Sequence, residues 1–182
     1  MEEAQAKKPR ALVVEDVDML RRVLGKQLKE LGFVVSYAVT SQGALAFYGE
    51  TNPFDVVFMD HLMKGSETNG AEAAFNIRKK DSAVCIICLT ATPVQMQAEL
   101  LEKFAVEKLD EIEGLCVVNK PYKLDCLKLI LQLHGFILKD STASQLREFD
   151  VQIQQSIVAN DSESSTEKAH VNSPSPSRKD SE

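Results

Sequence analysis

VVFMDHLMKGSETNG, residues 56–70, combines an apolar run with a polar, glycine-containing loop. Four apolar residues lead directly into the carboxylate of Asp60. A short, continuous apolar run is typical of a strand that is buried on both faces, as in a parallel sheet. A carboxylate at the end of such a strand has two explanations: an ordinary turn residue, or a functional group that the strand holds in place.

Around this stretch, strand-like apolar runs alternate with helical patterns. Strands are expected at 11–14, 34–39, 55–60, 83–89 and 115–120, and helices at 19–31, 41–50, 70–80, 93–108 and 123–136. Five strand–helix repeats with continuously apolar strands predict an open, doubly wound parallel α/β sheet with helices on both faces. Ligands of such sheets bind at the carboxyl ends of the strands, so those ends are the place to look for function.

The helix expected at 19–31, MLRRVLGKQLKEL, has a clear apolar spacing. Its large apolar residues are expected to face the core: Met19, Val23, Leu24, Leu28 and Leu31. Asp16 or Asp18 is expected to cap the start of this helix, and Gly32 to end it. Ser41 is expected to cap the helix that follows the second strand.

Cys85 and Cys88 form a C-x-x-C motif, which can indicate a metal or redox site. The surrounding VCIICL is a strand pattern, however, and residues three apart on a strand point to opposite faces of the sheet. Both thiols are therefore expected to pack, reduced, in the core of an intracellular protein. We expect no metal or redox role for them.

Polar residues follow four of the five expected strands. The first strand leads into Glu15 and Asp16, the third into Asp60, the fourth into Thr90 and the fifth into Lys120. Because the carboxyl ends of parallel strands meet at one edge of the sheet, we expect these side chains to converge there. The convergence argues for function more strongly than any one of these residues alone.

The residue types at this edge suit phosphoryl chemistry. Three carboxylates raise each other's pKa unless a cation neutralises them, and oxygen ligands without His or Cys suit Mg²⁺. Asp60 is the candidate nucleophile, which would attack a phosphoryl group and become an aspartyl phosphate. Lys120 can supply a second positive charge, and Thr90 a hydroxyl donor, for the phosphoryl oxygens.

The motifs VVEDVDMLRR, VVFMDHLM, LTA and NKPY, in this order on their strands, resemble the response-regulator receiver domains of two-component and phosphorelay systems. The resemblance implies a flavodoxin-like fold with strand order 2-1-3-4-5 and a cis-prolyl peptide after Lys120. It implies that Asp16 and Asp60 bind Mg²⁺ directly, that Glu15 does so through water, and that the backbone carbonyl of Leu62 completes the protein ligands. It also implies a signalling protein that catalyses its own phosphorylation and dephosphorylation. Because no DNA-binding helix-turn-helix and no catalytic output domain is recognised in the sequence, a stand-alone receiver is expected.

The same resemblance names the expected partners. The phosphoryl donor would be a histidine kinase or a histidine phosphotransfer protein. The output would be a conformational change that binds an unknown downstream protein, or the passage of phosphate onward. The net charge of −6 argues against a nucleic-acid surface.

Three features depart from the pattern of that family. Lys64 follows Met63 where the family usually has proline, and the loop from Asp60 to Gly70 looks longer than usual. Val117 occupies the position, three residues before the lysine, where the family has an aromatic switch residue. These departures are expected to alter the lifetime of the phosphorylated state and the surface through which it acts.

Other interpretations compete with phosphoryl transfer to Asp60. A pseudo-receiver would act as an interaction module without turning over phosphate. The D-x-D of Asp16 and Asp18 resembles the nucleophile and acid/base pair of haloacid-dehalogenase-like phosphatases, but no later strand end supplies the second acidic pair. A nucleotide-binding turn is disfavoured because EDVDM lacks glycines and is acidic. His61 is expected to be a solvated loop residue, and not a catalytic one.

The chain is expected to divide into an N-terminal arm at 1–9, a receiver domain at 10–139, an extra amphipathic helix at 140–158 and a disordered Ser-rich tail at 159–182. No secretory leader or membrane-spanning run is recognised, so a cytoplasmic location is expected. Ser173 and Ser175 precede prolines, which makes proline-directed phosphorylation, a eukaryotic source and an additional nuclear location hypotheses.

Overall fold

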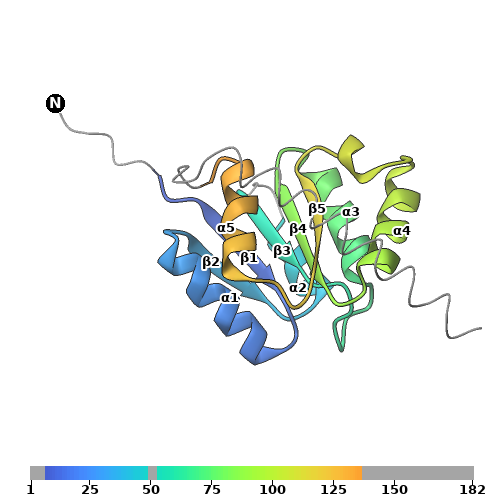
Figure 1. Ribbon diagram of the computed structural model, residues 1–182. Coiled ribbons are helices and arrows are strands. Elements are labelled where there is room, and N and C mark those ends of the chain that lie inside the picture. Colours follow the sequence, from blue (N-terminus) through green and yellow to red (C-terminus); the bar gives the residue numbers. More distant parts are fainter. Residues whose placement is uncertain (1–6, 49–52, 137–182) are drawn as a thin grey trace, which may run out of the picture. The chain divides into compact units, whose positions relative to one another are not determined.

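The computed structural model describes residues 7–48 and 53–136 of the 182-residue chain. Strands and helices alternate along it (Figure 1): β1 (Arg10–Val14), α1 (Asp18–Glu30), β2 (Val34–Ala38), α2 (Ser41–Ala46), β3 (Val56–Met59), α3 (Gly70–Lys80), β4 (Cys85–Thr90), α4 (Pro93–Phe104), a 3₁₀ turn (Leu109–Glu111), β5 (Leu115–Asn119) and α5 (Leu124–Leu133). Every strand and helix expected within these residues is present. Helices α2, α4 and α5 end before the expected residues 50, 108 and 136.

Several expectations from the sequence concern residues outside the described part of the chain. They are the first residues of the arm at 1–9, the extra helix at 140–158, and the tail at 159–182 with Ser173 and Ser175. Within the described part, no helix has the length and apolar character needed to cross a membrane.

The sheet is parallel throughout and has the strand order β2-β1-β3-β4-β5. This arrangement is the flavodoxin-like fold that the sequence predicted. Because β1 lies between β2 and β3, the chain reverses direction across the sheet after β2, and the strand ends next to that reversal form the usual ligand site of such folds. β1 and β3 are neighbours, with Val14 opposite Met59 at their carboxyl ends.

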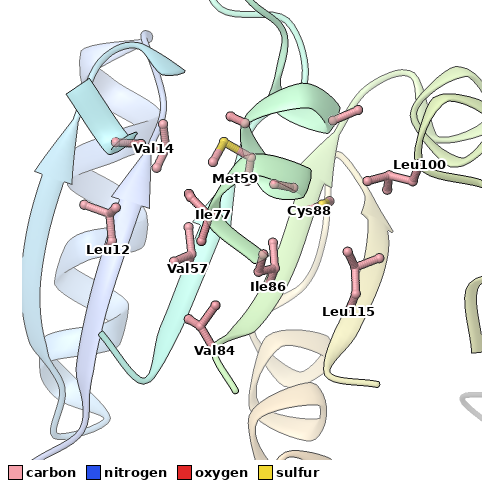
Figure 2. Close-up of a cluster of buried hydrophobic side chains, with 14 of the residues drawn as sticks. Leu12, Val14, Val57, Met59, Ile77, Val84, Ile86, Cys88, Leu100 and Leu115 are labelled. Carbon is pink, nitrogen blue, oxygen red and sulfur yellow. The ribbon is translucent and has the colours of Figure 1, made fainter. Parts of the chain in front are cut away.

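Helices cover both faces of the sheet (Figure 1). On one face, alternate strand residues such as Val57 and Ile86 pack with Ile77 of α3 and Leu100 of α4, as Figure 2 shows. On the other face, the intervening strand residues pack against Leu28 of α1 and Leu131 of α5. The named side chains of both layers are fully buried, so each face of the sheet is closely packed against its helices.

Cys85 and Cys88 are confirmed as core residues on opposite faces of β4. Cys85 belongs to the cluster under α1 and α5, and Cys88 to the cluster under α3 and α4. Their relative exposures are 6% and 0%. Two thiols separated by a sheet cannot share a metal ion, so the C-x-x-C motif is structural here.

Strand β2 corrects the expectation that all five strands are buried on both faces. It forms the edge of the sheet, and Val34 and Tyr37 are exposed on it. Its exposed position leaves Tyr37 free to cover α1, where a Cβ built on Gly25 would lie 2.2 Å from the Tyr37 hydroxyl oxygen. Glycine is therefore the residue that allows this ring to lie against the helix.

Helix α1 also corrects part of its predicted core face. Leu24 and Leu28 are buried as expected, but Met19 and Val23 are 68% and 49% exposed. The spacing identified residues that share one side of the helix, whereas the sheet covers only a narrower strip of that side. Gly32, with φ of 94°, follows the last turn and ends the helix as predicted.

The predicted helix caps are wrong in two places. Helix α1 has Val17 at its N-cap and no side-chain cap, so neither Asp16 nor Asp18 caps it. Helix α2 is capped by Thr40, whose Oγ1 accepts a hydrogen bond from the Gly43 N–H at 3.1 Å. The helix therefore starts at Ser41, one residue after its cap.

Candidate functional site

The polar residues expected at the strand ends are held there by backbone hydrogen bonds that extend the sheet. The Asp60 N–H donates to the Val14 carbonyl at 3.0 Å, and the Lys120 N–H donates to the Thr90 carbonyl at 2.7 Å. The Glu15 N–H donates to the Ala38 carbonyl at 3.1 Å. The last residue of each ladder is therefore fixed relative to its neighbours before any side-chain contact is made.

Lys120 joins two of the three carboxylates. Its Nζ lies 2.6 Å from Glu15 Oε2 and 2.9 Å from Asp60 Oδ1. The three side chains are only 18%, 7% and 12% exposed, respectively, in the order Lys120, Glu15 and Asp60. One cation thus offsets the repulsion between two acids that burial would otherwise make costly. The expected convergence of these residues is confirmed.

Asp16 completes a cluster of three carboxylates. Oxygen atoms of Glu15, Asp16 and Asp60 all lie within 4.8 Å of one another. A set of three acidic oxygens, without nitrogen or sulfur ligands, suits a hard divalent cation such as Mg²⁺. The residues present therefore fit a magnesium ion.

The acidic turn after β1 is braced by Arg21 and Lys64. Arg21 Nη1 donates to the backbone carbonyls of Glu15 and Asp16 at 2.8 and 3.2 Å. The Lys64 N–H donates to Asp16 Oδ2 at 3.0 Å. Proline, the usual family residue at this position, has no N–H to donate. The departure at Lys64 therefore adds a hydrogen bond to one of the clustered carboxylates.

Asp18 does not join the cluster. It lies in the first turn of α1 with its side chain 57% exposed, and it forms ion pairs with Arg21 and Arg22 at 2.6 and 2.8 Å. This geometry gives no support to a phosphatase site in which Asp18 would act as the acid/base partner of Asp16.

Thr90 ends β4 as a buried residue, with 1% relative exposure. Its Oγ1 accepts a hydrogen bond from the Thr92 N–H at 3.0 Å and lies 3.2 Å from Thr92 Oγ1. Thr90 does not cap the helix that follows, because the N-cap of α4 is Thr92. A capping role, which would be the ordinary structural alternative for this residue, is therefore excluded.

The loop after Asp60 returns to the site at Gly70. The Gly70 N–H donates to the His61 carbonyl at 2.7 Å, and a Cβ built on Gly70 would lie 1.9 Å from the Asp60 carbonyl oxygen. Only glycine permits this approach without moving the backbone of Asp60. Leu62, in the same loop, has a side chain that is 56% exposed, and its role as a carbonyl ligand stays a prediction.

His61 corrects the expectation of a solvated loop residue. It is completely buried, with Nδ1 2.9 Å from Thr92 Oγ1 and Nε2 3.1 Å from Glu99 Oε2. Glu99 Oε2 also accepts a hydrogen bond from Asn69 Nδ2 at 2.6 Å. Burial disfavours the charged form of Glu99, but the hydrogen bonds from His61, Gln95 and Asn69 together hold its pKa below the ordinary value.

Sequence reasoning missed Thr92, Glu99 and Asn69. The spacing of Asn69 and Glu72 is a signal for a helix start, and Asn69 Oδ1 does accept from the Glu72 N–H at 3.0 Å. No local pattern identifies Glu99, because its contact with His61 spans 38 residues. Val117 is buried, with 9% relative exposure, in the core cluster under α3 and α4.

A family model described as "response regulator receiver domain" matches residues 11–131 of the chain. Regulatory protein AtoC of Escherichia coli (strain K12) is 32% identical over 124 residues, which are 68% of this chain and 24% of AtoC. The chain therefore spans about a quarter of the length of that relative.

Solved structures with the same fold include two at more than a quarter identity. The non-phosphorylated HemR receiver domain from Leptospira biflexa is 27% identical with a TM-score of 0.57, and the match covers 74% of this chain and 100% of that one. The response regulator TrrA from Thermotoga maritima, in complex with Mg²⁺ and BeF, is 29% identical with a TM-score of 0.55, covering 69% of this chain and 98% of that one.

Proposed function

Since the chain belongs to the response regulator receiver family, we propose that it accepts a phosphoryl group on Asp60 from a phosphohistidine donor. The observation that carries the proposal is the position of the Asp60 carboxylate, which lies 2.9 Å from Lys120 Nζ and beside Glu15 and Asp16. Catalysis of phosphoryl transfer depends mainly on a fixed position of the nucleophile and on positive charge near the phosphoryl oxygens.

In the proposed transfer, an Asp60 carboxylate oxygen forms a bond to phosphorus while the phosphorus–nitrogen bond of the donor imidazole breaks. The donor imidazole leaves with the electron pair of that bond. Lys120 remains beside Asp60 and offsets the charge that gathers on the phosphoryl oxygens. The Thr90 hydroxyl, at the end of the adjacent strand, donates a hydrogen bond to one of those oxygens.

The carboxylates of Glu15, Asp16 and Asp60 would hold a magnesium ion, with the Leu62 carbonyl as a further ligand. When bound, the ion would neutralise negative charge on the phosphoryl oxygens. Support comes from the oxygen-only donor set and from TrrA, whose structure is described as a complex with Mg²⁺ and BeF. Arg21 and the Lys64 N–H orient the acidic turn for this role.

The donor would be a histidine kinase or a histidine phosphotransfer protein, and the expected location is the cytoplasm, where such donors act. None of the relatives argues for a nuclear location. The output would be a conformational change that recruits a further protein, or the onward passage of phosphate. The protein would then be a signalling protein that catalyses its own phosphorylation and dephosphorylation.

The test is incubation of the full chain with acetyl phosphate and Mg²⁺, followed by intact-mass measurement. One phosphoryl adduct is expected, and Asp60→Asn or chelation of Mg²⁺ should abolish it. Asp125→Asn is a matched control, because Asp125 lies in α5 with its side chain 93% exposed. Absence of any adduct in the unmodified chain, together with absence of Mg²⁺ binding, would contradict the proposal and favour a phosphorylation-independent interaction module.

A further inference from the structure

His61 is an unusual residue to find directly beside a phosphoacceptor, because it is completely buried and both of its ring nitrogens have partners. Nδ1 lies 2.9 Å from Thr92 Oγ1, and Nε2 lies 3.1 Å from Glu99 Oε2. The His61 ring therefore connects the loop that follows Asp60 with Thr92, the N-cap of α4, and with Glu99 in the middle of that helix. Burying a polar ring in this way is tolerated only because its hydrogen bonds are made.

Thr92 is the second unexpected feature. It is the N-cap residue of α4, a position at which a threonine oxygen normally accepts a hydrogen bond from the helix backbone. Here it makes no such bond. Its hydroxyl instead lies between two other side chains, 3.2 Å from Thr90 Oγ1 and 2.9 Å from His61 Nδ1. The capping role has been exchanged for a link between Thr90 and His61.

The directions of these hydrogen bonds are assigned for a neutral His61 ring that carries its hydrogen on Nε2. A carboxylate only accepts, so His61 Nε2 carries the hydrogen that it shares with Glu99. In the neutral ring with this tautomer, Nδ1 is an acceptor and takes the hydrogen of the Thr92 hydroxyl. Since that hydroxyl has one hydrogen, the Thr92 oxygen can only accept from the Thr90 hydroxyl.

Beyond His61, the hydrogen-bond network reaches helices α4 and α3 through Glu99 and Asn69. Glu99 Oε2 accepts from Asn69 Nδ2 at 2.6 Å, and Asn69 caps α3 by accepting from the Glu72 N–H. Glu99 Oε1 accepts from Gln95 Nε2, one turn earlier on α4, at 3.0 Å. A displacement of the His61 ring would therefore be felt at the first turns of α4 and at the start of α3.

We propose that Thr92, His61 and Glu99 are positioning residues that transmit the phosphorylation state of Asp60 from Thr90 to the first half of α4. The inference rests on the proposed function. The Thr90 hydroxyl has a single hydrogen, which it gives to Thr92 in the unphosphorylated protein and to a phosphoryl oxygen once Asp60 is phosphorylated. Thr92 then loses its donor, the bond from Thr92 to His61 weakens, and the hold of His61 on Glu99 changes with it.

The hydrogen-bonded chain through Thr92 and His61 offers a path to α4 that does not need an aromatic residue at position 117. Position 117 carries valine, so no aromatic ring can follow a movement of Thr90 there. The hydrogen-bonded chain reaches α4 by another path, through buried side chains with defined donors and acceptors.

The test compares Thr92→Val and Thr92→Ser in the full chain. Valine matches threonine in shape and removes only the hydroxyl, whereas serine restores it. Each protein is treated with acetyl phosphate and Mg²⁺, and intact mass gives the fraction phosphorylated so that samples are compared at equal occupancy. Amide hydrogen exchange in α4 and the ¹⁵N signals of the His61 ring are then recorded with and without phosphorylation.

In the unmodified protein, phosphorylation is expected to change exchange in the first half of α4 by about fivefold or more, the usual range for coupling between sites. The His61 Nδ1 signal should shift with it. Thr92→Val should lose both responses, and Thr92→Ser should recover them. The ring signal is the decisive readout, because a merely structural threonine would leave the response of His61 to phosphorylation unchanged.

Lys103→Met is the matched control. Lys103 on α4 contacts Glu72 on α3, so its removal weakens the same pair of helices without touching His61. It should keep both responses. The inference is overturned if Thr92→Val responds as the unmodified protein does, if Thr92→Ser fails to recover the response, or if Lys103→Met abolishes it equally. Absence of any phosphoryl adduct overturns the proposed function itself, whereas an adduct without change in α4 or His61 overturns this inference alone.

Discussion

The ammonium group of Lys120 lies 2.9 Å from Asp60 Oδ1, although Lys120 follows β5, Asp60 follows β3, and β4 lies between these two strands. The same ammonium group lies 2.6 Å from Glu15 Oε2. A long side chain from β5 thus crosses the end of β4 and brings a positive charge to the acidic cluster. Its place beside the proposed nucleophile makes Lys120 the first residue to test.

Lys120→Met keeps the length of the side chain and removes its charge. We expect phosphorylation of Asp60 by acetyl phosphate to slow by about 10²–10³-fold, as for loss of one preorganised electrostatic contact. The rate is measured by intact mass over time. Lys123→Met, the same change at an exposed residue nearby, should phosphorylate at the unmodified rate. Equal rates for Lys120→Met and the unmodified chain would remove Lys120 from the mechanism.

Gly70→Ala tests the closure of the loop after Asp60. The added methyl group would lie 1.9 Å from the Asp60 carbonyl oxygen, so the backbone of Asp60 has to move. We expect a loss of about 1–3 kcal/mol in the free energy of unfolding and slower phosphorylation. Urea unfolding and intact-mass kinetics measure the two effects.

Gly43→Ala is the control for that change. Its methyl group would lie 3.2 Å from the Thr40 hydroxyl oxygen and 3.6 Å from the Ala38 Cβ, with no backbone in the way, within a helix that alanine favours. Unfolding free energy should stay the same or rise slightly, and phosphorylation should be unaffected. If the two alanine variants behaved alike, the close approach of Gly70 to Asp60 would be unimportant.

The cysteines should be unreactive in the folded protein. Burial raises the pKa of Cys85 to about 12, of Cys116 to about 12 and of Cys126 to about 11, and holds the pKa of Cys88 well above its ordinary value. Because the thiolate is the reactive species, iodoacetamide near pH 8 should modify none of them until urea is added, after which all four react. Rapid native modification of Cys85 and Cys88 would contradict their placement in the core.

The ion pair between Glu72 on α3 and Lys103 on α4 predicts a pH dependence. The hydrogen bond from Lys103 lowers the pKa of Glu72, and the same bond raises the pKa of Lys103. The contribution of Glu72 to the free energy of unfolding is therefore present above about pH 4.3 and is lost as the pH falls through the folded-state pKa of Glu72. The contribution of Lys103 to the free energy of unfolding is present below about pH 10.4 and is lost as the pH rises through the folded-state pKa of Lys103.

Lys103→Met measures this contribution. Since both side chains are about a third exposed, solvent screening limits it to roughly 0.2–1 kcal/mol. Urea unfolding should show that difference from the unmodified chain at about pH 7 and a smaller one at about pH 3. A difference of the same size at both pH values would mean that Lys103 stabilises through packing of its aliphatic stem.

The strand ends could be predicted from the sequence because each lies next to its own apolar run. Asp60 follows VVFM and Lys120 follows LCVVN, so a parallel arrangement of the strands was enough to bring them together. The positions of Met19 and Val23 could not be predicted in the same way. Helical spacing groups residues on one side of α1, but only the packing of the helix on the sheet determines how wide a strip is covered.

His61 shows why part of the site escaped sequence reasoning. It follows the end of a strand in a polar loop, and such residues are usually solvated. Its burial depends on Thr92 and Glu99, which approach from a helix that begins more than 30 residues later. A buried hydrogen-bonded histidine thus became visible only when the packing of α4 over the loop was known.

The most direct test of the proposed phosphoacceptor is to identify the modified residue. Borohydride reduces an aspartyl phosphate to homoserine, so treatment of the phosphorylated full chain, followed by peptide mass mapping, marks the site. We predict homoserine at position 60 and nowhere else in the chain. Homoserine at position 16, or phosphate on His61 or on a serine in place of Asp60, would contradict the assignment of Asp60 as the phosphoryl acceptor.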